Sequence, residues 1–472
     1  MAGLLKDWII LLGSNVIQHG FTAVTYLYLA RVFKPEEYGR FSVILTAVSI
    51  AQLIASLGMS RIVTREIAAR PESAPVLIRN FRMYLSYAAL LTSIITVIYL
   101  FNFEAVSDIT ILIIICLLFF INTGWNYFEA IAFGYSKFRL TGLTGAVFAI
   151  VIFVSVFFGV KNSSQLTLAL VIMASGGLLK LLVMSYFLHD LYGNKSASEQ
   201  GNFSLLVSSL PLYGTVLLSL PIIQMPVLFL SQFSGKAEVG YFAAISKFTV
   251  PITLLIHNLN TIILPKLSQK YTADKESFRI MTRNLFLLIA LGGILLSFVS
   301  GTFSREMILL FLGAPYDPAS LPLALQFWIT LNMMFHSFIG TVMVSAGKER
   351  LMVKLSFFNA IVIGSLILAG SFYGALGMSI AMWCGYLAGI IVHLYFLNSS
   401  IEKFVSYKLI TAILLLFSAG TVAVYYITYQ ELVVKILAGL GLLMVSYLTF
   451  RFVLSENKQK EVRDIIMMVR NG

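Results

Sequence analysis

Residues 27–41 read LYLARVFKPEEYGRF, and residues 228–242, which begin 201 positions later, read LFLSQFSGKAEVGYF. Each stretch begins near the end of one long apolar run and ends at the start of another, so each marks a turn between two helices. The match therefore predicts an internal duplication in which the two turns occupy equivalent places. The five identities are Leu27/Leu228, Leu29/Leu230, Glu37/Glu238, Gly39/Gly240 and Phe41/Phe242.

The apolar character extends over the whole chain of 472 residues, of which 59% are hydrophobic and only 11% are charged. An ordinary soluble domain has about 25% charged residues, and the mean hydropathy here is +0.90. A disordered chain, a secreted disulfide scaffold and a soluble enzyme with one anchor are excluded. Since a bilayer-spanning helix needs about 20 apolar residues, about 14 helices account for nearly the whole sequence. The apolar runs fall at residues 7–30, 41–60, 82–101, 109–133, 140–160, 166–189, 204–232, 239–264, 284–303, 319–346, 352–373, 375–398, 408–428 and 432–453.

Six runs precede a polar stretch at residues 193–202, and eight runs follow it. The two repeat copies are six runs apart, and an even separation indicates parallel repeats related by an axis along the membrane normal. We therefore predict an all-α polytopic membrane protein with two parallel-repeat six-helix bundles around a central cavity, plus two C-terminal helices. The expected divisions are a first bundle at 1–190, a cytoplasmic linker at 191–203, a second bundle at 204–398, and two C-terminal helices with a cytoplasmic tail at 399–472.

The formal charge of +12 is explained by topology. With the N-terminus inside, most of the 33 Lys and Arg residues fall on cytoplasmic segments, which places both termini in the cytoplasm by the positive-inside rule. A nucleic-acid partner is not expected. Cys116 and Cys384 lie inside apolar runs without a CxxC motif or neighbouring ligands, so they are interpreted as packing residues, and no metal or cofactor is expected.

Polar side chains in the first helix share one face. At 100° per residue, Asn15, Gln18, His19, Thr22 and Tyr26 fall within an arc of about 100°. Such a stripe is unfavourable against lipid. It indicates either hydrogen bonds between packed helices or the wall of a hydrated cavity.

Two lysines lie within apolar runs. Lys247 shares a face of the eighth expected helix with Pro251 and Asn258 and lies near the bilayer midplane, where a lysine is costly unless it faces water or a partner. We interpret Lys247 as a cation facing a cavity. Lys180 follows the small residues 175–177 in the sixth helix and has either the same role or a side chain that reaches the inner membrane interface.

Other residues of chemical interest carry less weight. Glu129 and Asp190 lie towards the cytoplasmic ends of their helices, so no central carboxylate for a proton or sodium relay is evident. His257, His336 and His393 are on separate helices and are interpreted as packing or helix-linking residues. The sequence has no Walker-type phosphate loop and no G-x-S-x-G motif, which argues against ATP hydrolysis within this chain.

Five segments resemble one known family. They are LARVFKPEEYGRFS (29–42), GMSRIVTREIA (58–68), FGYSKFRLTG (133–142), VGYFAAISKFTVPI (239–252) and LPKLSQKY (264–271). The chain resembles, over residues 5–395, the bacterial polysaccharide flippases, the O-antigen repeat-unit transporters of the MATE-like (MOP flippase) superfamily. Two further C-terminal helices are usual in that group, although the matching motifs are loose.

The resemblance implies a transporter, not an enzyme. It would move an undecaprenyl-pyrophosphate-linked oligosaccharide from the cytoplasmic to the periplasmic leaflet of the bacterial inner membrane by alternating access. A polysaccharide polymerase and chain-length proteins are candidate partners. In the family a cationic cavity between two halves accepts the pyrophosphate and sugars, which implies a cavity site here of Lys247, Lys180, Arg31, Asn15, Gln18, His19 and Asn258.

Other transport or enzymatic functions compete with this interpretation. A MATE-type multidrug or cation antiporter resembles the same architecture but commonly uses a carboxylate in the first helix, where this chain has Asn15 and Gln18. A lipid II flippase performs the nearest related task. A multispanning polysaccharide polymerase or ligase would be an enzyme, and usually carries a long periplasmic loop that is absent here.

Overall fold

The computed structural model describes residues 2–102, 108–192, 204–400 and 407–453, and within them every regular element is a helix. The chain forms two compact units, one of Met1–Pro251 with Ser371–Ala375 and the other of Ile252–Gly370 with Leu376–Gly472. The elements of the first unit are α1 (Ala2–Ala55), α2 (Met59–Ala69), η1 (Pro71–Ser73), α3 (Ala74–Asn102), α4 (Ile109–Gly134), α5 (Phe138–Gly159), η2 (Ser163–Gln165), α6 (Leu166–Tyr192), α7 (Ser204–Ile223), α8 (Met225–Phe233), α9 (Lys236–Ile245) and η4 (Ser371–Tyr373). Those of the second are α10 (Val250–Ala273, which starts in the first unit), α11 (Lys275–Thr302), α12 (Ser304–Phe311), η3 (Ala314–Ala319), α13 (Ser320–Ser345), α14 (Glu349–Gly370), α15 (Gly374–Ser400), α16 (Tyr407–Ile427) and α17 (Leu432–Val453).

The helices have the length and composition of membrane spans. In the described residues, eight helical stretches are long and apolar enough to cross a membrane, and a bent pair makes a ninth. Two of the eight, with 46 and 51 residues, are each more than twice the length of one span. They contain backbone breaks at Lys34 and Gly374, where φ is +60° and +70°. The protein is therefore a multi-pass helical membrane protein. Each of the fourteen apolar runs is mostly helical in the structure, while fourteen crossings remain a prediction.

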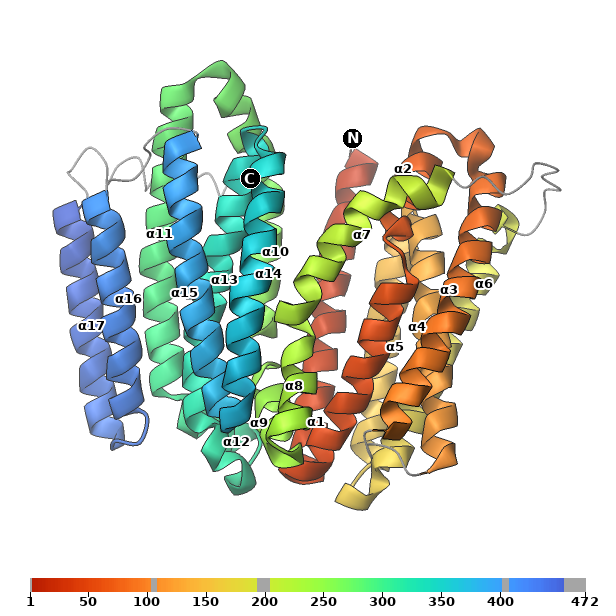
Figure 1. Ribbon diagram of the computed structural model, residues 1–472, viewed down its shortest axis with the longest axis horizontal. Helices are drawn as coiled ribbons and strands as arrows, with labels where there is room; N and C mark the ends of the chain where they lie inside the picture. Colours follow the sequence, from red (N-terminus) through yellow and green to blue (C-terminus); the bar gives the residue numbers. More distant parts are fainter. Residues whose placement is uncertain (1, 103–107, 193–203, 401–406, 454–472) are drawn as a thin grey trace. The chain divides into compact units, whose positions relative to one another are not determined.

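The break in α1 turns the chain back on itself (Figure 1). Pro35 fixes its own φ, lacks an N–H, and disfavours helical geometry at the residue before it. Lys34 accordingly leaves the helix, and the chain continues as a second arm beside the first. The sequence stretch that suggested a duplication is thus a tight turn between two arms of one helix.

The second repeat copy packs directly on this turn (Figure 1). A Cβ atom on Gly39 would lie 1.9 Å from the carbonyl oxygen of Lys236, and a Cβ atom on Gly240 would lie 1.9 Å from that of Pro35. Lys236 and Gly240 are the counterparts of Pro35 and Gly39 at the 201-residue offset. Each contact is therefore the image of the other, as at a two-fold symmetric interface. We call these four residues the glycine seam.

Each copy is also anchored to a 3₁₀ turn. The Tyr28 hydroxyl donates to the carbonyls of Phe157 and Val160, at 3.1 and 2.9 Å, just before η2. At the other copy, the Ala375 N–H donates to the Glu238 carboxylate at 2.6 Å, just after η4. The two copies are thus each bonded to a segment next to a 3₁₀ turn, although through positions that do not correspond.

Three expected spans are interrupted, at residues 56–58, at Gln224 and at residues 246–249. The predicted span at 239–264 consists of α9 and α10, which are bent by 46° across residues 246–249. Pro251 cannot donate the hydrogen bond that the carbonyl of Lys247 would receive in a continuous helix. Lys247 lies in this break, so the premise that it shares a helical face with Asn258 is wrong. The side chain of Asn258 lies outside the described residues.

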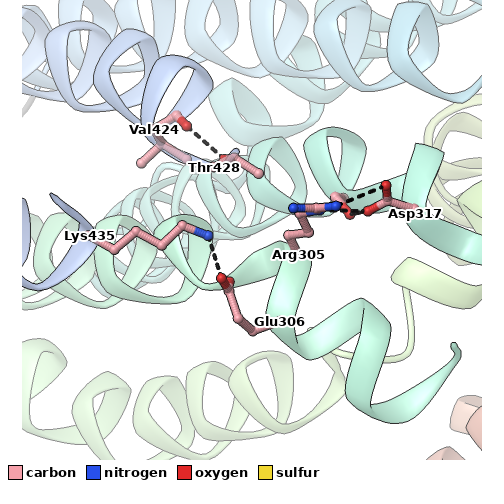
Figure 2. Close-up of polar contacts among 7 residues, drawn as sticks. Arg305, Glu306, Asp317, Val424, Thr428 and Lys435 are labelled. Atoms are coloured by element: carbon pink, nitrogen blue, oxygen red, sulfur yellow. Dashed lines mark hydrogen bonds and ion pairs between the residues drawn. The ribbon is translucent and has the colours of Figure 1, made fainter. Parts of the chain in front are cut away.

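The C-terminal helices α16 and α17 form a hairpin that packs on α11 in the second unit. α12 supplies two adjacent charges beside this hairpin (Figure 2). Glu306 accepts from the Lys435 ammonium at 2.5 Å, and Arg305 donates to Asp317 at 2.9 Å. The Lys435 side chain is only 1% exposed, so its charge depends on this contact. The predicted linker at 191–203 falls largely on residues outside those described, and the expected six-plus-six-plus-two division remains a prediction.

Candidate functional site

A polar cavity of about 220 Å³ lies within the first unit, between the two arms of α1 and helices α4, α5 and α6. One ordered water needs roughly 10–15 Å³ measured in this way, so the cavity has room for a substantial chemical group. Its lining includes hydroxyl, amide, aromatic and ammonium groups and, among the described residues, no Asp or Glu. The lining residues are Thr22, Thr25, Tyr26, Leu45, Val48, Ser49, Leu118, Ile121, Asn122, Trp125, Ala149, Ile152, Met173, Gly177 and Lys180.

Lys180 supplies the positive charge of the cavity. Its Nζ atom lies 3.3 Å from the centroid of the Trp125 ring, directly over the indole face. Glu129 lies one helical turn after Trp125 on α4 and within electrostatic range of Lys180. One face of the indole is thus covered by an ammonium.

Gly177 explains how α6 brings Lys180 to this place. A Cβ atom on Gly177 would lie 2.9 Å from the side chain of Ile121 on α4, so only glycine permits this approach of the two helices without displacement. Lys180 follows one turn later and faces Trp125, which is itself one turn after Ile121. The small residues at 175–177, noted in the sequence, therefore position the lysine.

Hydroxyl groups of α1 give the cavity hydrogen-bond acceptors. Thr22 and Thr25 donate to the carbonyls of Gln18 and Phe21 at 2.7 Å, and Ser49 donates to that of Leu45 at 2.9 Å. Because each hydroxyl proton is used within its own helix, the oxygens present lone pairs to the cavity. A ligand with several hydrogen-bond donors suits this lining.

Lys247 approaches the cavity wall from the break between α9 and α10. Its Nζ atom lies 5.0 Å from the centroid of Tyr26, one of the lining residues. Lys247 is half-buried and is not itself in the lining. Discontinuous helices near a binding site are common in secondary transporters. The structure therefore brings both predicted lysines to one cavity region, Lys180 in the lining and Lys247 beside the lining residue Tyr26.

The other predicted site residues lie outside the lining of this cavity. Gln18 packs against Gly145 of α5, at 2.0 Å from where a Cβ atom would stand, and Asn15 is half-buried. His19 is exposed and within electrostatic range of Lys180. Arg31 is exposed near the turn of α1. Of the polar stripe on the first helix, Thr22 and Tyr26 are the members that reach the cavity.

Trp125 and Asn122 are cavity residues that were not predicted from the sequence, and Glu129 lies close to Lys180 although its place near a helix end gave it little weight. The signal was present in α4, where the apolar run is interrupted by polar and aromatic residues at helical spacing, Asn122, Trp125 and Glu129. Residues three and four apart share a helical face. Hydropathy alone could not show that this face meets Lys180.

A second polar cluster lies in the second unit. The His336 and His393 rings are in edge contact with centroids 4.7 Å apart, and the Asn359 amide lies 3.5 Å from His336 Nδ1. His336 and His393 each have one ring nitrogen on a backbone carbonyl, of Tyr386 and Gly389. As expected, His336 and His393 lie on separate helices, α13 and α15. The bonds of His336 to Tyr386 and Asn359 link α13 to α15 and α14. The described residues contain no group of three or more His, Cys, Asp or Glu placed to hold a metal ion.

Comparisons with known proteins agree with this architecture. The model of the polysaccharide biosynthesis protein family matches residues 4–271. Capsular polysaccharide biosynthesis protein CapF of Staphylococcus aureus is 22% identical over 409 residues, which cover 83% of this chain and 99% of CapF.

Among solved structures, lipid II flippase MurJ in an inward closed conformation matches 95% of this chain and 99% of its own, with a TM-score of 0.70 and 15% identity. A multidrug resistance MATE family transporter of the MOP superfamily, in an inward-facing conformation, matches 84% of this chain and 98% of its own, with a TM-score of 0.58 and 15% identity. These likenesses show the fold of MOP superfamily transporters. Because the family model covers more than half of its length, the chain belongs to the polysaccharide biosynthesis protein family.

Proposed function

We propose that this protein is a flippase for an undecaprenyl-pyrophosphate-linked oligosaccharide, the repeat unit of O-antigen or another surface polysaccharide. It moves the head group from the cytoplasmic to the periplasmic leaflet of the bacterial inner membrane by alternating access. Family membership supports the polysaccharide context, and the likeness to MurJ supports a lipid-linked substrate. The single observation that carries the proposal is the cavity with Lys180 in its lining and Lys247 beside it.

The physical requirement is a hydrated, positively charged path. A pyrophosphate cannot enter the apolar bilayer core unpaired, whereas the polyprenyl tail can remain in lipid throughout. Lys180 and Lys247 give the anion partners, Arg31 gives an exposed cation near the outer turn, and the hydroxyl-lined wall accepts hydrogen bonds from sugars. No bond is made or broken in this process, so the protein acts as a transporter and not as an enzyme.

The proposal includes the topology expected from the sequence. Fourteen spans, with both termini in the cytoplasm, form two parallel six-helix repeats around a central cavity, followed by two C-terminal helices. The reciprocal contacts of Gly39 and Gly240 support the duplication. A polysaccharide polymerase and chain-length proteins would act on the product at the periplasmic face.

An antiporter of cationic drugs is less well supported by the cavity. Its described lining contains Lys180 and no carboxylate, so the local charge favours anions. Glu129 is not part of the described lining and interacts electrostatically with Lys180. A buried cation at this place would therefore meet repulsion from the ammonium.

The test uses the full-length protein in liposomes that carry a fluorescent polyprenyl-pyrophosphate disaccharide. A membrane-impermeant reductant that destroys the fluorophore then measures transfer between leaflets. We expect the protein to accelerate transfer and Lys180→Ala to lower the rate about tenfold, the value of one charge-assisted contact. Lys270→Ala, which removes an exposed lysine of α10, is the matched control and leaves the rate unchanged. Transfer no faster than in empty liposomes would refute the proposal.

A further inference from the structure

One face of the Trp125 indole ring contacts the Lys180 ammonium, and a different ligand can take the place of that ammonium. The ring belongs to α4, and Glu129 lies one helical turn further along the same helix. One ring face is covered by the Lys180 ammonium, with Nζ 3.3 Å from the centroid. Both Trp125 and Lys180 belong to the cavity lining. A movement of one flexible lysine side chain would thus expose an aromatic face to the cavity.

The chemistry of the two partners favours that movement when an anion arrives. A cation over an aromatic face is held by the ring quadrupole, whereas an ammonium and a phosphate form a shorter and stronger charge-assisted hydrogen bond. Glu129 already balances part of the charge of Lys180, so an anion with several charges competes best. Pyrophosphate has this property, and it would draw the ammonium away from the indole.

The uncovered face then has its own preference. The negative π face of an indole attracts the weakly positive C–H groups on the apolar side of a sugar ring. Around it, the oxygens of Thr22, Thr25 and Ser49 present lone pairs that accept from sugar hydroxyls. Carbohydrate is the ligand class that combines an apolar ring face with many hydroxyl donors at its edge.

We infer that the Trp125 ring face is a sugar subsite masked by Lys180, so that the arrival of the pyrophosphate uncovers the surface on which the adjoining sugar stacks. This inference rests on the proposed flippase function and names the part of the head group that each residue recognises. Lys180 takes the pyrophosphate, and Trp125 takes the first sugar. Trp125 is therefore a specificity residue that distinguishes a glycosylated lipid from its sugar-free carrier.

The test compares two fluorescent lipids in the liposome assay, polyprenyl pyrophosphate with and without a disaccharide. Trp125→Leu is expected to lower transfer of the glycosylated lipid about tenfold and to leave transfer of the sugar-free lipid unchanged. Trp125→Phe, which retains an aromatic face, recovers most of the loss, and Lys180→Ala lowers both lipids alike. Phe158→Leu is the control, because that aromatic side chain on α5 is 71% exposed.

The two proposals fail in different ways. Wild-type protein that moves neither lipid refutes the flippase function without reference to Trp125. Wild-type protein that moves both, together with Trp125→Leu protein that loses both equally or neither, refutes the sugar subsite. Retained transfer of the sugar-free lipid by Trp125→Leu shows that this variant is folded.

Tryptophan fluorescence provides a second measurement that is independent of transport. Inorganic pyrophosphate added to the purified full-length protein should change the emission, because the ammonium leaves the indole. The change should be absent in Trp125→Phe and in Lys180→Ala. An equal change of emission in the wild type, Trp125→Phe and Lys180→Ala would refute the inference that Lys180 leaves the Trp125 ring when pyrophosphate binds.

Discussion

Alanine at Gly39 should destabilise the first unit strongly, and alanine at Gly240 should do so equally. The new methyl carbon would lie 1.9 Å from a backbone carbonyl oxygen in each case, where contacts below 3.0 Å are essentially never found. Neither atom belongs to a flexible side chain, so the two helices must separate by more than 1 Å. That separation would disrupt the packing of Tyr38, Phe41 and Val239, which are at most 1% exposed.

The expected magnitude follows from two opposing terms. Overpacking a close-packed site costs about 1–3 kcal/mol where side chains can adjust, and here they cannot, so about 3 kcal/mol or more is expected. Glycine to alanine within a helix stabilises by about 1 kcal/mol through propensity alone. Gly20→Ala measures that term in the same helix, because nothing lies within 4 Å of its Cβ position.

Thermal unfolding of the purified protein in detergent, followed by size-exclusion chromatography after heating, gives the comparison. A loss of about 3 kcal/mol lowers the midpoint by about 6 °C or more for a unit of this size. Gly20→Ala should match or exceed the wild type. If Gly39→Ala were as stable as Gly20→Ala, the close approach in the glycine seam would be wrong. If Gly39→Ala lowered the unfolding midpoint and Gly240→Ala did not, the two glycine contacts would not be reciprocal.

Three further outcomes can be measured with single substitutions. Glu306→Gln leaves the ammonium of Lys435, which is 1% exposed, without its carboxylate. We expect the free energy of unfolding to fall by about 2 kcal/mol, which is less than the 3–5 kcal/mol of a fully buried pair because Glu306 is 45% exposed. Adding Lys435→Met should restore the stability. Glu129→Gln removes the charge that competes for Lys180, so pyrophosphate should bind roughly fivefold more tightly in a fluorescence titration, and weaker binding would contradict the pairing. Hydrogen bonds from the Ser277 side chain and backbone hold the pKa of Asp274 below its ordinary value. The ionised Asp274 therefore stabilises α11 at any pH above its pKa in the unfolded chain. This stabilisation is lost as the pH falls through the lower pKa of Asp274 in the folded protein. Asp274→Asn should flatten that acid dependence in thermal unfolding below about pH 4, and an unchanged acid dependence would show that the carboxylate has no such role.

The helices were predictable because the cause is local. A run of about 20 apolar residues is sufficient to favour a bilayer-spanning helix, and each predicted run is mostly helical in the structure. The breaks within the helices could not be predicted from hydropathy alone. The bend beside Lys247 was encoded by Pro251, but the apolar run continues through it, so a single helix was the natural and incorrect interpretation.

The candidate site was predictable only in part, because hydropathy does not show which helices pack together. Lys180 and Lys247 were identified because a lysine within an apolar run is costly wherever it lies. Trp125 and Asn122 are unremarkable within a membrane helix, and Glu129 was set aside for its position near a helix end. These residues are brought together by lateral packing among α1, α4 and α6. Gly177 permits one of those close approaches, but the sequence does not show which helix it packs against.

The two matching stretches show how a weak sequence signal can correspond to a reciprocal contact in the structure. Only five of fifteen positions match between residues 27–41 and 228–242, yet the contacts of Gly39 and Gly240 are reciprocal. The seam constrains one position in each copy to lack a side chain, because a carbonyl oxygen occupies the place of Cβ. The carbonyls opposite belong to Pro35 and Lys236, and a carbonyl is supplied by any residue type. The side chains at those positions are therefore free to differ, so the geometry can persist while most of the sequence similarity is lost.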